Sequence, residues 1–144
     1  MMVIENHIVD VEVPGPGLYE ITGDLNERLK ALQVESGLMT LFIQHTSASL
    51  LIQENADAEV KGDLKKFFHR LVPQSTDPSM SYLQHTYEGP DDMPAHIRAA
   101  LTQSQLSLPV YNRALQLGTW QGIYLFEHRT RPHRRQLAVH VIGQ

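Results

Sequence analysis

Alternating apolar and polar residues at both ends of the chain constrain its fold more than any other feature. Residues 3–13 read VIENHIVDVEV, a pattern typical of a half-buried strand. The alternation slips at Ile8-Val9, so we expect a bulge there. Residues 137–142 (LAVHVI) alternate without a break. Two such strands enclosing helical segments predict an α+β fold with a largely antiparallel sheet or sandwich.

The middle of the chain contains three segments with helical spacing. Residues 56–71 carry their apolar side chains on one face and end before a proline. A shorter helix is expected from a cap at Asp24 to a stop at Gly37. A third is expected from Pro94 to about Thr102, with Leu101 facing inward. Residues 74–87 are polar and predict a long loop. Short strands are expected at residues 19–22, 39–44, 49–53, 106–110, 115–117 and 123–127.

Length and composition predict one ordinary globular domain. The chain has 144 residues, no linker and no repeat, so we expect a single domain over residues 1–144. The net charge of −4 argues against a nucleic-acid binder. No stretch has the apolar length of a membrane helix or the pattern of a signal peptide, so we expect no membrane partner. The lack of Cys excludes disulfides and thiolate metal sites and fits a cytoplasmic protein.

Polar residues interrupt the apolar elements most densely at residues 85–96, which hold two His and three acids. Imidazole and carboxylate together suit Zn²⁺, whereas carboxylate-rich sites suit Mg²⁺ or Mn²⁺. The spacing matches no fixed metal motif. A third ligand would come from elsewhere, and His45 at a strand end is the natural candidate. In the alternative interpretation, Asp91 or Asp92 caps the helix and both His are solvated.

Two other polar stretches have structural and functional interpretations that the residues alone leave open. Residues 44–57 follow a strand, and no Gly-x-Ser-x-Gly pattern marks a nucleophile among their serines. Residues 117–122 form either a turn with a packed Trp or a backbone that bends past a ligand or a neighbouring chain. Four arginines at 129, 131, 134 and 135 form either a phosphate site or a solvated strand end.

These stretches together resemble one family of small bacterial and archaeal proteins. The matching text is HTSA at 45–48, ENAD at 54–57, EGPDDMPAHI at 88–97, LGTWQGIY at 117–124 and PHRR at 132–135. It resembles the YjbQ-like family, also called secondary thiamine-phosphate synthases, from about residue 3 to the end. The resemblance implies an α+β fold with a mixed sheet, a homotrimer, and a His-lined metal pocket near a subunit boundary.

The resemblance also implies roles for individual residues. The metal ligands it implies are His45, His85 and His96. The catalytic residues it implies are Glu88, Asp92 and Arg134. The substrate-binding residues it implies are Thr46, Ser47, Trp120, Gln121 and Arg135.

The activity implied by the resemblance joins a pyrimidine diphosphate to a thiazole phosphate and releases pyrophosphate. A divalent metal, Zn²⁺ or Mg²⁺, would neutralise the leaving diphosphate. Two alternatives remain open: a metal-dependent hydrolase of a phosphorylated or cyclic small molecule, and a non-catalytic trimer that binds a metal or ligand. The first predicts turnover with water as nucleophile, and the second predicts tight binding without turnover.

The sequence departs from the family pattern at two positions. Asn112 is followed by Arg113, where the family usually has Gly, and a different turn there would shift the following strand. Tyr87 stands where an acid is common, which removes one potential carboxylate from the site.

Overall fold

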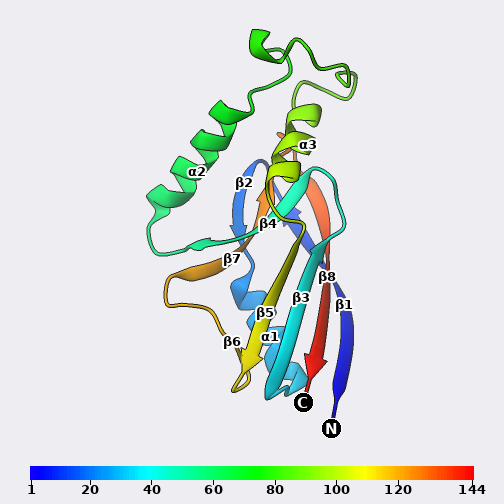
Figure 1. Cartoon of the computed structure of the whole chain (residues 1–144), viewed down its shortest axis with the longest axis vertical. Helices are drawn as coiled ribbons and strands as arrows, with labels where there is room; N and C mark the ends of the chain where they lie inside the picture. Colours follow the sequence, from blue (N-terminus) through cyan, green and yellow to red (C-terminus); the bar gives the residue numbers. More distant parts are fainter.

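Two antiparallel sheets form the framework of the chain (Figure 1). A computed structural model describes all 144 residues. The larger sheet has the strand order β1 (Val3–Val13), β8 (His133–Gly143), β3 (Ser36–Ile43), β5 (Gln105–Tyr111) and β6 (Ala114–Leu115). The smaller sheet has the order β2 (Gly17–Glu20), β7 (Gln121–Glu127) and β4 (Ala48–Glu54). The predicted α+β class is confirmed, although every strand pair is antiparallel and the sheet is not mixed.

The two terminal strands pair with each other along their whole length. The β1–β8 ladder runs without interruption from Val3 opposite Gly143 to Val13 opposite His133. The bulge expected at Ile8-Val9 is therefore absent. Val9 is buried, while Ile8 lies on the outer face and remains exposed, because an unbroken strand turns successive side chains to opposite faces.

The hydrophobic core lies between the two sheets and is completed by α1 (Thr22–Leu32). Leu25 and Leu29 of α1 join it. Asp24 lies within the first turn and makes no cap, so that expectation was wrong. The helix ends at Gln33, which adopts a left-handed conformation (φ 55°). Gly37 instead lies in β3, where an added Cβ would overlap the carbonyl oxygen of Ile142 in the neighbouring strand.

The helix α2 (Ala58–Leu71) packs less closely than its apolar stripe predicts. Asp57 caps it by accepting a hydrogen bond from the backbone N–H of Glu59 (2.9 Å). No residue of the helix is fully buried, and Phe67 is 57% exposed. The helix contacts the smaller sheet through Phe68, whose ring meets that of Phe126 edge-on at 5.2 Å between centroids. The ribbon of α2 accordingly stands apart from the strands (Figure 1).

The helix α3 (Asp92–Leu101) follows a long loop, as predicted, that contains one short 3₁₀ turn (η1, Pro78–Met80). It begins two residues before Pro94, and Leu101 is exposed rather than inward. Its buried residues include Asp92 and Arg98, so the face turned towards the protein is partly charged. None of the three α-helices combines the length and the apolarity needed to cross a membrane.

The turn at residues 112–113 keeps the tight geometry that the family glycine would favour. Asn112 and Arg113 both have positive φ (56° and 62°), as in the two-residue hairpin turns that match strand twist. The side chain of Glu35 accepts a hydrogen bond from Arg113 Nε at 3.0 Å, and its carbonyl accepts one from the Arg113 backbone N–H. The strand β6 therefore pairs in hairpin register, Tyr111 opposite Ala114, and the shift expected from the missing glycine does not occur.

Candidate metal centre

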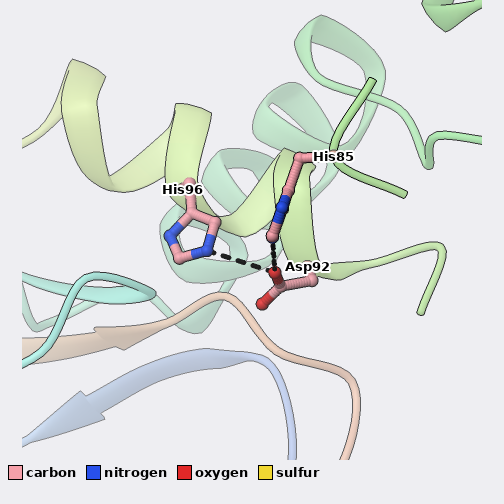
Figure 2. Close-up of side chains that lie close together, drawn as sticks. All are labelled: His85, Asp92 and His96. Atoms are coloured by element: carbon pink, nitrogen blue, oxygen red, sulfur yellow. Dashed lines mark hydrogen bonds and ion pairs between the residues drawn. The ribbon is translucent and has the colours of Figure 1, made fainter. Parts of the chain in front are cut away.

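Three side chains converge where α3 begins: His85 from the preceding loop, and Asp92 and His96 from one face of the helix (Figure 2). Asp92 and His96 are four residues apart, which places them on neighbouring turns of the same face. Asp92 Oδ2 lies 2.9 Å from His85 Nε2 and 3.2 Å from His96 Nε2. One ligand atom from each residue lies within 4.8 Å of the others. Atoms bound to one tetrahedral Zn²⁺ lie roughly 3.3 Å apart, so the spacing fits such an ion.

The second ring nitrogen of His96 fixes which of its atoms can bind a metal. His96 Nδ1 lies 2.9 Å from the carbonyl oxygen of Thr46 and donates its proton to it, because that oxygen can only accept. In a neutral ring Nε2 then carries a lone pair, which faces the Asp92 carboxylate. Two acceptors at this distance require a proton or a cation between them. The donor set therefore fits a divalent metal, and each imidazole keeps about a third of its surface exposed (30% for His96).

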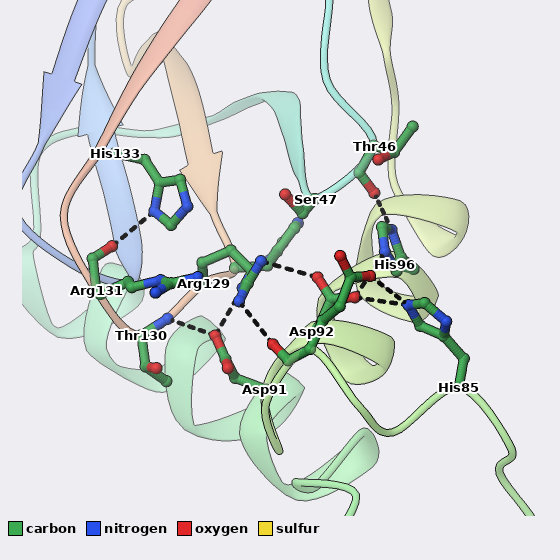
Figure 3. A network of polar contacts seen from close by, with 12 residues as sticks. Thr46, Ser47, His85, Asp91, Asp92, His96, Arg129, Thr130, Arg131 and His133 are labelled. Atoms are coloured by element: carbon green, nitrogen blue, oxygen red, sulfur yellow. Dashed lines mark hydrogen bonds and ion pairs between the residues drawn. The ribbon is translucent and has the colours of Figure 1, made fainter.

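Arg129 orients the Asp92 carboxylate from the side opposite the histidines (Figure 3). Its Nη1 donates to Asp92 Oδ1 at 2.8 Å, and its Nε donates to Asp91 Oδ2 at 2.7 Å. Burial alone would raise the pKa of Asp92, but its contacts with His85, His96 and Arg129 lower the pKa below its ordinary value. Asp92 is thus ionised and held with Oδ2 turned towards the histidines, as a ligand carboxylate requires.

Glu88 adds a second carboxylate to the exposed side of the cluster. Its Oε2 lies 2.8 Å from His85 Nε2, and its side chain is 56% exposed. Tyr87 packs edge-on against the His85 ring at 4.7 Å between centroids. Tyr87, which stands where the family commonly has an acid, therefore packs against the ring of His85. Glu88 is the more exposed of the two acids that contact His85.

The segment at residues 45–47 reaches the centre only through its backbone. Thr46 contributes its carbonyl oxygen to His96. His45 is not one of the three converging side chains: its Nε2 accepts the backbone N–H of Gln136 at 2.7 Å. Burial and the nearby charge of Arg135 lower the pKa of His45. Ser47 is buried and accepts a hydrogen bond from Arg135 at 2.9 Å.

The remaining predicted residues lie outside the cluster. Arg135 is 3% exposed and forms a bidentate ion pair with the buried Glu127, so it is engaged within the protein. Arg134 points to the outer face of the large sheet and pairs with Asp10 at 2.9 Å. Trp120 and Gln121 stand at the start of β7, separated from Glu127 at its end by roughly 20 Å of strand. Within one chain, these residues do not border the three converging side chains.

Arg129 and Asp91 are the functional residues that sequence reasoning missed. Arg129 stood among four arginines, and no local pattern distinguished the one that faces α3. Asp91 was considered only as a helix cap, but it makes no cap and instead accepts hydrogen bonds from Arg129 and from the backbone N–H of Thr130 (3.0 Å). Its pKa falls to about 2: burial opposes the shift, but the contacts with Arg129 and Thr130 outweigh it. The adjacent acids Asp91 and Asp92 were the available signal, since carboxylates that become buried need cationic or hydrogen-bonding partners.

Comparison with known proteins gives consistent matches over nearly the whole chain. The family described as UPF0047 protein YjbQ-like matches residues 8–144. A UPF0047 protein from Synechocystis is 47% identical over 137 residues, covering 95% of this chain and 90% of the relative. The YjbQ protein of Salmonella typhimurium is 41% identical over 129 residues, covering 89% and 90%.

Solved structures agree with the sequence relatives. A conserved hypothetical protein from Thermus thermophilus is 32% identical with a TM-score of 0.73, covering 91% of this chain and 97% of its own. A YjbQ/UPF0047 protein from Clostridium acetobutylicum is 28% identical with a TM-score of 0.79, covering 92% and 98%. The resemblance inferred from the five sequence motifs is confirmed, and the chain belongs to the YjbQ-like UPF0047 family.

Proposed function

We propose that this chain is a metal-dependent enzyme acting on a small phosphorylated molecule. The first candidate reaction is of the thiamine-phosphate synthase type, joining a pyrimidine diphosphate to a thiazole phosphate with release of pyrophosphate. The observation that carries the proposal is the convergence of His85, Asp92 and His96 at a partly exposed surface. Zn²⁺ suits this mixture of imidazole and carboxylate, and Mg²⁺ suits diphosphate chemistry.

The residues of the cluster divide into holding and proton-handling roles. His85 and His96 would hold the ion through Nε2 and Asp92 through Oδ2. A divalent ion in this position would supply charge neutralisation for a diphosphate group. Arg129 keeps Asp92 ionised and oriented. Glu88 has an exposed carboxylate beside the ligands and is placed to take or return a proton on the substrate.

Hydrolysis of a phosphorylated or cyclic small molecule is the second candidate reaction. The observation that favours it is the exposure of Glu88, since a solvent-facing carboxylate beside metal ligands can accept a proton from water. Both reactions would use the same three metal-binding residues. They differ in whether a second organic substrate is required for turnover.

Metal content and product analysis test the proposal together. The purified protein, His96→Ala and the control His7→Ala would be analysed for bound metal, since His7 is a partly exposed histidine of β1 outside the three ligands. Each protein would then receive pyrimidine diphosphate and thiazole phosphate with Zn²⁺ or Mg²⁺. We expect thiamine phosphate from the parent and the control, and none from His96→Ala.

The other outcomes are equally informative. Release of phosphate without the thiazole substrate would support the hydrolase. Bound metal with no turnover across a panel of phosphorylated substrates would identify a binding protein and refute the enzymatic proposal. Metal content that is unchanged in His96→Ala would refute the ligand set.

We also propose that the chain forms a homotrimer through the outer face of the large sheet. The register aligns Ile4, Ile142 and Leu38 in one row across three strands, and Ile8, Ala138 and Phe42 in another. The five large side chains of these rows are exposed, which marks the face as an association surface. Light scattering is expected to give three times the chain mass of 16.3 kDa, and Phe42→Glu is expected to give the monomer mass. A parent protein of monomer mass would refute the proposal.

A further inference from the structure

A cavity of about 560 Å³ lies between α2, α3 and the adjoining ends of β2 and β7. Its volume falls in the range of small-molecule sites. The cavity and the metal centre use different faces of α3. Asp91, Pro94 and Arg98 line the cavity, whereas Asp92 and His96 face the metal centre. At about 100° per residue, the centres of these two faces are separated by roughly 150° around the helix axis. The cavity is therefore a second site, opposite the one described above.

The cavity carries unpaired positive charge. Lys65, Lys66 and Arg70 of α2 line it, and none of them forms an ion pair. The two acids in its wall, Asp91 and Glu127, are each neutralised by an arginine outside the lining. The excess of cations is thus available to a ligand with negative charge.

Arg98 lacks a partner for one of its N–H groups. The residue is 9% exposed, its Nη2 donates to the carbonyl of Val72, and its buried Nε has no hydrogen-bond partner. It forms no salt bridge with any carboxylate. A buried guanidinium that keeps an unsatisfied donor is costly unless an acceptor completes it.

His128 presents a second polar atom without a partner in the same wall. Ser49 Oγ lies 2.9 Å from His128 Nε2, and Thr102 Oγ1 lies 2.7 Å from Ser49 Oγ and 2.8 Å from the carbonyl oxygen of Arg98. Burial, together with the charges of Arg98 and Arg135, lowers the pKa of His128 to about 3, so the ring is neutral at neutral pH. Its Nδ1 is buried and has no hydrogen-bond partner. The wall thus holds two buried nitrogen atoms without partners, and that of Arg98 is a donor that a ligand with acceptor oxygens can satisfy.

Aromatic rings form another part of the wall. Phe68 and Phe126 meet edge-on at 5.2 Å, and the His128 ring lies 4.3 Å from Phe126 between centroids. This surface offers no charge and suits an apolar or aromatic body. A bare inorganic anion would leave it in contact with water.

We infer that this cavity binds a phosphorylated small molecule with an aromatic or apolar body. Arg98, Lys65 and Lys66 hold the phosphate, and Phe68 and Phe126 pack against the body. The inference is independent of the proposed enzymatic function, because no metal ligand takes part. The three cations supply charge, and the unpartnered Nε–H of Arg98 supplies a directed hydrogen bond.

Calorimetric titration with phenyl phosphate tests the inference, at fixed ionic strength and with EDTA present to silence the metal centre. The test variant is Lys65→Gln/Lys66→Gln, and the control Lys30→Gln/Lys61→Gln removes the same charge from residues outside the cavity. We expect the test variant to weaken binding at least tenfold and the control to weaken it less than twofold. Asp92→Asn is expected to bind as the parent does, and inorganic phosphate is expected to bind the parent more weakly than phenyl phosphate.

Three results would overturn the inference. The first is no binding of phenyl phosphate by the parent at millimolar concentration. The second is equal weakening in the test and control variants, which would indicate general attraction to charge. The third is loss of binding in Asp92→Asn with full binding in the lysine variant, which would place the anion at the metal centre. Because both lysines are exposed, folding of the test variant is not in question.

Discussion

Replacing Arg135 with Met is expected to destabilise the protein strongly, because it leaves the buried carboxylate of Glu127 without its ion-pair partner. The side chain of Glu127 is 0% exposed and that of Arg135 is 4% exposed. Removing one partner of such a pair costs about 3–5 kcal/mol. An unfolding entropy of about 2.1 cal/mol/K per residue gives ~0.3 kcal/mol/K for this chain. The melting temperature should therefore fall by about 10–16 °C.

The neighbouring arginine provides the matched control for this measurement. Arg134 is paired with Asp10, but its side chain is 66% exposed, so Arg134→Met should cost at most ~1 kcal/mol, or about 3 °C. The double variant Arg135→Met/Glu127→Gln should recover part of the loss, since neutral Gln still accepts the backbone N–H groups of His128 and Arg129. Scanning calorimetry at one protein concentration measures all three. If Arg135→Met melts no lower than Arg134→Met, the buried charge pair does not have the structural role assigned to it.

Three further outcomes are expected from the same structure. Saturating metal at about 100 times its Kd should raise the melting temperature of the parent by ~9 °C and that of His96→Ala not at all, as followed by thermal unfolding. Because the pKa of His128 is lowered to about 3, the unfolded state binds a proton below pH 6.5 that the folded state does not. Stability to urea should therefore fall as pH drops from 6.5 towards 3, and the fall should be shallower in His128→Gln. Gly37→Ala should destabilise the protein by more than ~2 kcal/mol through overlap with β8, whereas Gly62→Ala, with open space around its Cβ, should stabilise α2 by about 0.5–1 kcal/mol in chemical denaturation.

The fold could be predicted from the sequence where one clear periodicity of apolar residues determined the type of element. The alternation in residues 3–13 predicted β1 with the correct first and last residues, and the alternation in residues 137–142 predicted which side chains of β8 face the core. Both predictions succeed because a strand that is buried on one face needs an apolar side chain at every second position. Helix ends were less accurate. Gly37 resembled a helix stop in sequence, but the strand that passes close to it is distant along the chain. Only the pairing of β3 with β8 explains why that position lacks a side chain.

The site was predictable in part for a related reason. His85, Asp92 and His96 lie within twelve residues, so their convergence needs only one loop and one helical turn. The placement of His45, Arg134 and Arg135 depends on which way each side chain leaves its strand or loop, and on partners more than eighty residues away. Arg129 reaches Asp92 across 37 positions of sequence, and only the tertiary fold places the segment after β7 beside the start of α3.

The pairing of the two terminal strands has a consequence for how the chain acquires its structure. The strand β8 separates β1 from β3, so the large sheet lacks an inner strand until residues 133–143 have been synthesised. The ladder joins residues as distant as Val3 and Gly143, a non-local topology that slows folding to the range of milliseconds to seconds. During translation, β1 and β3 emerge with open hydrogen-bonding edges and without their shared partner. The nascent chain therefore depends on the late pairing of β8, and deletion of residues 133–143 would prevent assembly of the large sheet.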